Sequence, residues 1–204
     1  YRWHIKDAQN LRHQSIPLWL GKEKIFNKKI LVWSEQGLGD NIQFCRYITK
    51  IIEMGAEVTF EVQNNLKTLM KSISEKLKVV SIGNIKEKYD FQVPLMSLPL
   101  VFKTNFQTIP NKTPYLNISE ELRKHWSNIL GPKKKPRIGL TWSGNKNYRG
   151  DKLRSIKLKT FLPLLSNKYD FFCLQKDIRE EDREDFNNSS IKYFISSLID
   201  ILIK

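Results

Sequence analysis

The stretch ILVWSEQGLGDNIQFCRYI, residues 30–48, decides the fold class. Residues 29–34 (KILVWS) form a continuous apolar run rich in β-branched and aromatic side chains, which is typical of a buried strand in a parallel sheet. A glycine-rich turn over residues 35–40 follows it. Apolar residues then recur with helical spacing over residues 41–54, and Gly55 provides a natural C-terminal stop. The stretch therefore predicts a strand, a tight turn and a helix.

The same alternation continues along the chain. We predict strands over residues 57–62, 79–82 and 91–95, with an amphipathic helix over residues 64–77. Strand, helix, strand, helix, strand is the signature of a doubly wound, Rossmann-like α/β domain. Residues 98–114, which contain three prolines, are predicted to form a loop.

A second βα pattern begins near Arg137. It is preceded by a helix that opens at the N-cap Ser119 and ends near Gly131, and by the basic hinge of residues 133–136. Residues 143–155 form a long polar loop after the first strand of this pattern. The other elements predicted here are a strand over residues 137–142, a helix over 156–165, a strand over 170–175 and a helix over 178–186.

These patterns divide the chain into four parts. We predict a linker (residues 1–28), a Rossmann-like N-terminal domain (29–117), an interdomain helix and hinge (118–136) and a partial Rossmann-like C-terminal domain (137–204). A self-standing domain of this class needs roughly 100 residues or more, which the last part does not reach. Because the sequence also ends on an apolar segment, residues 198–203, we expect a fragment that stops within its second domain.

The charge leaves two interpretations open. The 204 residues carry a net charge of +14 and a pI of about 9.7, which fits either a polyanionic partner or a lysine-rich composition without functional meaning. Lysine outnumbers arginine 26 to 9, whereas proteins that bind nucleic acids depend on arginine for bidentate contacts. We therefore do not expect a nucleic-acid partner. Residues 133–159 nevertheless hold ten lysines and arginines against one acid, Asp151.

Hydropathy, the cysteines and the histidines bear on the location of the protein and on metal binding. The mean hydropathy is -0.45, and no stretch approaches the roughly 20 apolar residues of a membrane span. Residues 1–14 contain no apolar core of a secretory signal. Cys45 and Cys173 form no CxxC motif, so we expect a reducing, cytoplasmic location. The three histidines show no metal-ligand spacing, so we expect no metal.

The turn after the first strand holds the first candidate site. Gly37 and Gly39 allow a sharp turn and a close approach of a ligand to the backbone. A dinucleotide fingerprint would need a third small residue where Ile42 stands. Asp40 would also repel a pyrophosphate at the helix N-terminus, so it suits a general base better than a phosphate site. The alternative is that Asp40 only caps the helix.

The basic loop of residues 143–155 holds the second candidate site. Its backbone N–H groups, its hydroxyls and Arg154 could bind a diphosphate, and the alternative is a solvated lysine-rich loop. At the end of the following strand, Gln175 could bind a base edge and Lys176 could neutralise a phosphate. The alternative there is an ordinary strand end.

Together with GAEVTFEVQ, PLMSLPLVF, TIPNKTPYL, RIGLTWSGN, LRSI and FFCLQK, these motifs resemble the glycosyltransferase modules found C-terminal to tetratricopeptide repeats in bacteria. Those modules are similar to the heptosyltransferase-like glycosyltransferase family 9 and, more remotely, to O-GlcNAc transferase. The resemblance covers residue 1 to about residue 182. The opening YRW…PLWLGKE resembles the linker that joins the repeats to the enzyme, which implies a tetratricopeptide-repeat domain upstream.

The resemblance implies a GT-B architecture, with an acceptor-side N-terminal domain and a C-terminal domain that binds a nucleotide-sugar. It implies inverting transfer to a hydroxyl of a glycan or protein acceptor, with Asp40 as the base and positive or N–H groups, rather than a metal, at the leaving diphosphate. The implied acceptor-side loop residues are Gln36, Gly37 and Gly39, and the implied donor-side residues are Ser143, Gly144, Arg154, Ser155, Gln175 and Lys176.

One departure from the family leaves a second function class open. The family continues into a DTxxAHLAG-like segment that helps to hold the donor, and nothing after Asn187 matches it. The alternative to an active transferase is therefore a truncated, non-catalytic module that binds an anionic glycan or a partner protein.

Overall fold

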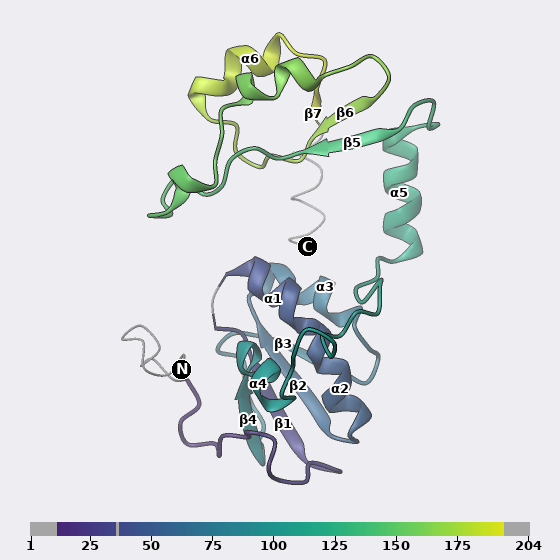
Figure 1. Cartoon of the computed structure of the whole chain (residues 1–204). Helices are drawn as coiled ribbons and strands as arrows, with labels where there is room; N and C mark the ends of the chain where they lie inside the picture. The colour runs from purple at the N-terminus through teal and green to yellow at the C-terminus, as the bar shows by residue number, and fades with distance from the viewer. Residues whose placement is uncertain (1–11, 36, 194–204) are drawn as a thin grey trace. The chain divides into compact units, whose positions relative to one another are not determined.

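The computed structural model describes residues 12–35 and 37–193, and the chain divides into two compact units, Tyr1–Ile118 and Ser119–Lys204 (Figure 1). Unit 1 is built on a four-stranded sheet in the order β3-β2-β1-β4, in which every pairing is parallel. Its strands are β1 (Lys29–Trp33), β2 (Glu57–Val62), β3 (Lys78–Ser81) and β4 (Phe91–Pro94). The predicted α/β class with parallel strands is confirmed.

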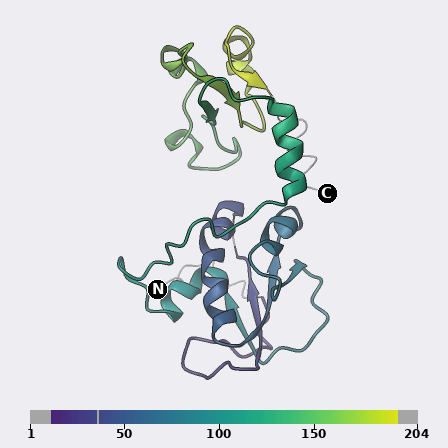
Figure 2. The ribbon, with the colours of Figure 1, turned by 90° about the vertical axis from the view of Figure 1, so that its right-hand side faces the viewer.

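The helical segment after β1 starts earlier than predicted. It consists of α1 (Leu38–Phe44), a 3₁₀ turn (Cys45–Tyr47) and α2 (Ile48–Glu53), which follow one another along the sheet (Figure 2). Gly37 takes the N-cap position, so the predicted glycine turn already forms the first turn of α1. Gly55, with φ of +81°, follows the end of α2 as predicted.

The segment predicted as a linker packs into unit 1 over its described part. Trp19 and Ile25 are completely buried in the core. The N–H of Trp19 donates to the carbonyl of Gln92 in β4 at 2.9 Å, and the N–H of Gln92 donates to the carbonyl of Pro17 at 2.8 Å. Residues 17–19 therefore extend the sheet beside β4.

Two predictions for unit 1 are wrong in detail. The helix predicted over residues 64–77 is a 3₁₀ turn (Asn64–Leu66) followed only by α3 (Lys67–Lys71). Ser72 ends it, because its hydroxyl donates to the carbonyl of Leu69 at 2.7 Å and so competes with the helix. The predicted loop of residues 98–114 opens with α4 (Leu98–Val101), whose proline lies in the first turn, where it is tolerated.

Unit 2 begins with α5 (Glu120–Leu130), whose predicted N-cap is confirmed: the Oγ of Ser119 accepts a hydrogen bond from the N–H of Leu122 at 3.2 Å. Its sheet has the order β5-β6-β7, again parallel, with β5 (Arg137–Leu140), β6 (Asp170–Cys173) and the unpredicted β7 (Lys192–Tyr193). Five buried side chains form its core: Trp142, Leu158, Phe171, Cys173 and Ile191.

The helices predicted in unit 2 are largely replaced by turns. Residues 156–165 form two 3₁₀ turns, Leu158–Thr160 and Leu162–Leu164, because Pro163 has no N–H to continue a helix. Residues 178–186 form a 3₁₀ turn (Glu180–Asp182) and then α6 (Arg183–Asn187). The apolar segment of residues 198–203 lies outside the described residues. Within residues 12–35 and 37–193, no helix is long and apolar enough to cross a membrane.

Candidate functional site

The predicted site residues follow the carboxyl ends of parallel strands, where open α/β sheets bind their ligands. In unit 1, β2 and β3 lie on one side of β1 and β4 lies on the other, so the strand order reverses next to β1. Glu35 follows β1, and its Oε2 accepts a hydrogen bond from the N–H of Met96, which follows β4, at 2.9 Å. This bond joins the two loops at the reversal point.

Asp40 is the third residue of α1, and it is half-buried. Its Oδ2 accepts a hydrogen bond from the N–H of Gly37 at 3.2 Å, so the carboxylate caps the helix as the alternative interpretation stated. The buried Asn41 holds this turn in place, since its Nδ2 donates to the carbonyl of Gly37 at 3.1 Å and to Oε1 of Gln63 at 2.8 Å. A role for Asp40 as a base stays a prediction.

The two glycines of the turn are not required by the backbone. Gly37 has φ of -65°, and among the described residues a Cβ there would meet only Oδ2 of Asp40 at 3.5 Å, an ordinary contact. A Cβ on Gly39 would meet nothing within 4 Å among the described residues. The space over Gly39 therefore leaves room for a ligand to approach the backbone. Gln36 lies outside the described residues.

A buried carboxylate lies near the carboxyl end of the strand beside β1, at one of two positions (Glu57 and Glu61) whose distance from the glycine turn would suit a ribose-binding acid. Glu61, near the end of β2, is 1% exposed. Its Oε2 lies 2.9 Å from Nε2 of His13 and 3.1 Å from Nη1 of Arg12, and its Oε1 accepts a hydrogen bond from the N–H of Gly83 at 3.0 Å. Arg12 also donates to the carbonyl of Ser34. The cluster ties the N-terminal segment to the carboxyl end of the sheet.

In unit 2, a hollow of about 360 Å³ opens at the carboxyl end of β5. It is lined by Thr141, Trp142, Ser143, Gly144, Arg154, Ile156 and Phe161. The Oγ of Ser143 is buried and has no hydrogen-bond partner among the described residues. A buried hydroxyl without a partner calls for a ligand or a water molecule. The structure thus brings the predicted residues Ser143, Gly144 and Arg154 to one hollow.

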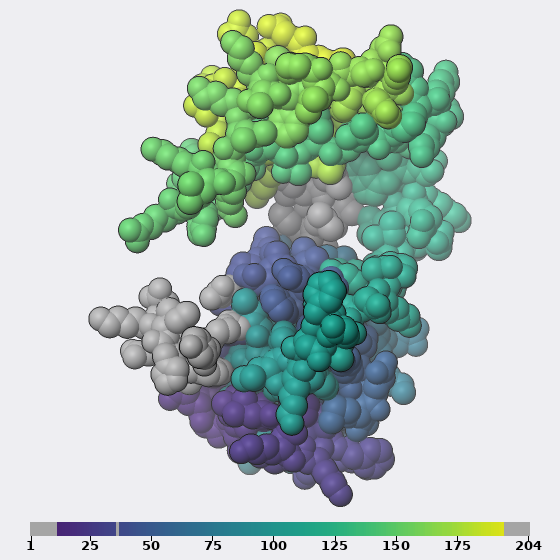
Figure 3. Space-filling model, in the orientation of Figure 1, coloured from purple at the N-terminus to yellow at the C-terminus, as the bar shows by residue number. Residues whose placement is uncertain are grey.

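Arg154 is the cation of this hollow. Its side chain is 51% exposed, with Cζ 4.4 Å from the ring centre of Tyr148 and Nε 3.9 Å from Oδ1 of Asp151. A Cβ on Gly144 would come within 2.7 Å of its guanidinium, so a glycine is needed for Arg154 to lie where it does. The loop that carries these residues stands out from the rest of unit 2 (Figure 3).

Ser155 supports the loop from inside. Its hydroxyl donates to Oδ1 of Asp151 at 2.6 Å and accepts a hydrogen bond from the N–H of Gly144 at 2.9 Å. Hydrogen bonds from Ser155 and then Arg179 hold the pKa of the Asp151 carboxyl below its ordinary value. The hydroxyl of Ser155 and the N–H of Gly144 are therefore bonded to one another, and contact of either with a phosphate stays a prediction.

Gln175 and Lys176 differ in their surroundings. The Oε1 of the buried Gln175 accepts hydrogen bonds from the N–H groups of Trp142 and Ser143, both at 3.1 Å, and its Nε2 donates to the carbonyl of Ser143 at 2.8 Å. Its amide thus holds the start of the loop, and contact with a base stays a prediction. Lys176 is exposed, and its predicted phosphate contact is likewise untested.

Two further residues after β6 hold this region, Arg179 the loop itself and Asp182 the segments before and after it, and sequence reasoning missed both. Nη2 of Arg179 donates to Asp151 and, at 3.3 Å, to the carbonyl of Gly144. Asp182, 1% exposed, accepts from Nε1 of Trp142 and from the N–H of Leu158, both at 2.9 Å. We call Gln175, Arg179 and Asp182 the brace. No local sequence pattern marks Arg179 or Asp182, because each bonds to groups far away along the chain.

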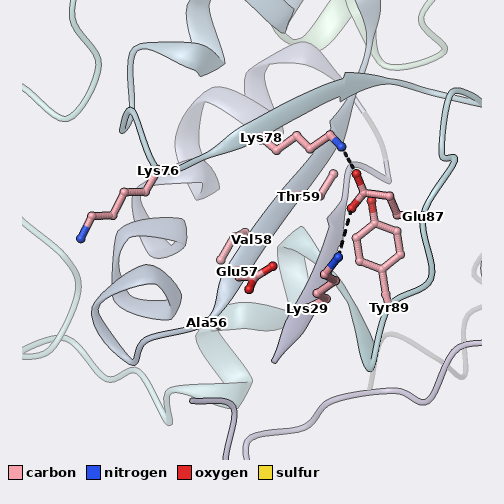
Figure 4. Close-up of a pocket in the computed structure, with 9 residues that line it drawn as sticks. All are labelled: Lys29, Ala56, Glu57, Val58, Thr59, Lys76, Lys78, Glu87 and Tyr89. Atoms are coloured by element: carbon pink, nitrogen blue, oxygen red, sulfur yellow. Dashed lines mark hydrogen bonds and ion pairs between the residues drawn. The ribbon is translucent and has the colours of Figure 1, made fainter. Parts of the chain in front are cut away.

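A second hollow, of about 380 Å³, lies in unit 1 beside the amino-terminal ends of β1 and β2 (Figure 4). Glu87 pairs there with Lys78 and, at 3.8 Å, with Lys29. The pairing with Lys78 lowers the pKa of Glu87 and raises the pKa of Lys78. Because Glu87 already pairs with both lysines, this hollow does not match the predicted anion site.

Neither metal ligands nor reactive thiols are found in the described part of the chain. No group of three or more His, Cys, Asp and Glu side chains there could hold a metal ion. Both cysteines are free and buried. Burial raises the pKa of the Cys45 thiol to about 12 and also raises the pKa of Cys173.

Comparisons with known proteins assign no family to this chain. No protein-family model matches the sequence, and no curated protein matches it. Among solved structures, the chain is similar to the bacterial iron-containing dodecameric glycosyltransferase TibC from enterotoxigenic E. coli H10407, with a TM-score of 0.49 and 12% identity. The match covers 76% of this chain and 44% of that chain. A likeness this distant assigns neither residues nor an activity.

Proposed function

We propose that the chain is part of a glycosyltransferase that moves a sugar from a nucleotide-sugar to a hydroxyl of a glycan or protein acceptor. The hollow of unit 2 is the observation that carries the proposal. It combines an exposed guanidinium, a buried hydroxyl without a partner among the described residues and a glycine that lets the guanidinium lie against the backbone. A guanidinium and a hydroxyl at the carboxyl end of a parallel strand suit a diphosphate.

The turn of unit 1 serves the acceptor. The half-buried Asp40 takes a proton from the acceptor hydroxyl while that oxygen attacks the anomeric carbon of the donor. The bond from this carbon to the diphosphate breaks, and its electron pair leaves with the diphosphate, whose charge Arg154 stabilises. The open space over Gly39 gives the acceptor access to the turn. Attack opposite the leaving group inverts the configuration at that carbon.

The donor half of the proposal can be tested by calorimetric titration of the whole chain with UDP, GDP, CDP and ADP. We expect saturable heat with at least one of them, and about a tenfold or greater loss of affinity in Arg154→Gln, because a charge-assisted hydrogen bond is lost. Arg183→Gln is the matched control, since Arg183 is exposed and pairs with Glu180 outside the hollow. The absence of saturable heat with all four nucleotides would refute this half.

The catalytic half separates a transferase from a binding module. With the sugar conjugate of the nucleotide that binds, we expect slow release of free sugar to water or transfer to an added acceptor. Asp40→Asn should abolish either reaction and leave the nucleotide affinity unchanged. Nucleotide binding without turnover would instead favour the non-catalytic module, and turnover that persists in Asp40→Asn would exclude Asp40 as the base.

A further inference from the structure

Arg179 makes three contacts through one nitrogen. Its Nη2 donates to the carboxylate of Asp151, to the carbonyl of Gly144 and to the hydroxyl of Ser155, the last two at 3.3 Å. All three partners belong to the loop that carries Arg154. The side chain of Arg179 is 24% exposed, whereas that of Asp151 is only 9% exposed. A single guanidinium therefore joins both ends of the loop.

The contacts close a ring of polar groups. Asp151 accepts from Ser155 and from Arg179, Ser155 accepts from the N–H of Gly144, and the carbonyl of Gly144 accepts from Arg179. The ring and the hollow share Gly144, which lines the hollow and lies against the guanidinium of Arg154. A shift of Gly144 would therefore move the surface on which Arg154 lies.

The other two brace residues, Gln175 and Asp182, hold other parts of unit 2. Gln175 bonds the strand end at Trp142 and Ser143, and Asp182 bonds the indole of Trp142 and the start of the next turn. Both act on buried groups of the core or its edge. Of the three brace residues, Arg179 alone bonds to Gly144, Asp151 and Ser155 within the loop, so its loss should loosen the loop without opening the core.

We propose that Arg179 is a positioning residue for the diphosphate site of unit 2: its ion pair with Asp151 fixes the 143–155 loop so that Arg154 faces the hollow. This inference rests on the proposed function. Arg179 itself does not line the hollow, and it acts on the ligand through Gly144 and Arg154.

The experiment compares Arg179→Gln with wild type and with Arg183→Gln in the whole chain. Two quantities are measured: the dissociation constant of the nucleoside diphosphate that binds wild type, and amide hydrogen exchange along the loop. Arg179→Gln should weaken binding about tenfold, because a displaced Arg154 would lose one charge-assisted hydrogen bond to the diphosphate. It should also speed exchange at the amides of Gly144, Arg154 and Ser155. Arg183→Gln should change neither quantity. A purely structural role would instead loosen all of unit 2.

The buried thiol of Cys173 reports whether unit 2 stays folded. If Arg179→Gln exposes Cys173 to alkylation, Asp151→Asn replaces it as the test variant. The amide keeps the shape of the side chain and an acceptor oxygen for Ser155, and it removes the charge and the acceptor that face Arg179. Unchanged affinity in a variant that keeps Cys173 protected would overturn the inference. A wild-type chain that binds none of the four diphosphates would overturn the proposed function together with this inference, whereas binding by wild type and by Arg179→Gln alike overturns only the inference.

Discussion

Both units open their sheets with a strand that leads into the same dipeptide, Trp33-Ser34 in unit 1 and Trp142-Ser143 in unit 2. In each unit the indole N–H of the tryptophan donates to a buried side chain: Gln92 at 2.6 Å in unit 1 and Asp182 at 2.9 Å in unit 2. In each unit the serine Oγ is buried without a partner among the described residues. The two units thus hold the end of their first strand in the same way.

The two units differ after this dipeptide. In unit 1 the chain turns within three residues into α1, and the helix packs on a core of 18 buried side chains. In unit 2 the chain forms a long basic loop, and the core has five buried side chains. Unit 1 is therefore held mainly by apolar burial, whereas unit 2 depends on the polar brace. Removal of polar contacts should consequently damage unit 2 more than unit 1.

The largest effect is expected from Asp182→Ala. It removes a buried carboxylate that accepts two hydrogen bonds, each worth about 1.5–3 kcal/mol when the acceptor is charged. We expect a loss of about 3 kcal/mol in the free energy of unfolding of unit 2 and none in unit 1. Each unit holds one buried cysteine, so pulsed alkylation in urea reports on unit 1 through Cys45 and on unit 2 through Cys173. Equal loss of protection at both thiols would contradict the view that Asp182 stabilises unit 2 and not unit 1.

The matched change in unit 1 is Gln92→Leu. It leaves the buried indole N–H of Trp33 without its acceptor, which costs about 1–3 kcal/mol. Only Cys45 should become easier to alkylate, and the shift in urea midpoint should be smaller than that of Asp182→Ala at Cys173. A shift in urea midpoint at Cys45 as large as the shift that Asp182→Ala causes at Cys173 would show that unit 1 depends on polar contacts as strongly as unit 2.

The same contrast explains what the sequence could predict. The strands of unit 1 follow from apolar runs such as residues 29–34, and all four are found near their predicted places. The helix predicted over residues 156–165 failed because Pro163 has no N–H with which to continue a helix. The brace could not be predicted, since its members bond to groups far away in sequence: Arg179 lies 35 residues from Gly144. Apolar periodicity is local, whereas such polar partners are set by the fold.

A smaller effect is expected from pH. The pKa of Asp151 is lower in the folded chain than the ordinary value of about 3.9. The ionised carboxylate therefore contributes fully to the stability of unit 2 above the ordinary pKa, and this contribution is lost as the pH falls through the folded pKa. Between about pH 6 and pH 3, unit 2 should therefore lose more stability in wild type than in Asp151→Asn. Parallel Cys173 unfolding midpoints in the two proteins would contradict this.

The smallest change in stability is expected from the two site glycines. Gly39→Ala should stabilise unit 1 by about 0.5–1 kcal/mol, because the helical position has space for a Cβ. Gly144→Ala should leave Cys173 protection unchanged but displace Arg154 and weaken diphosphate binding. Destabilisation by Gly39→Ala would show that the space over this residue is not open. Unaltered diphosphate binding in Gly144→Ala would show that Arg154 does not need the space beside Gly144 in order to bind.

Amide hydrogen exchange of the whole chain, with and without a saturating nucleoside diphosphate, tests the central claim most directly. The account predicts that the nucleotide slows exchange over residues 142–155 and leaves the region around Lys29 and Lys78 unchanged. Protection that appears at those two lysines instead, or at neither place while the nucleotide binds, would contradict it.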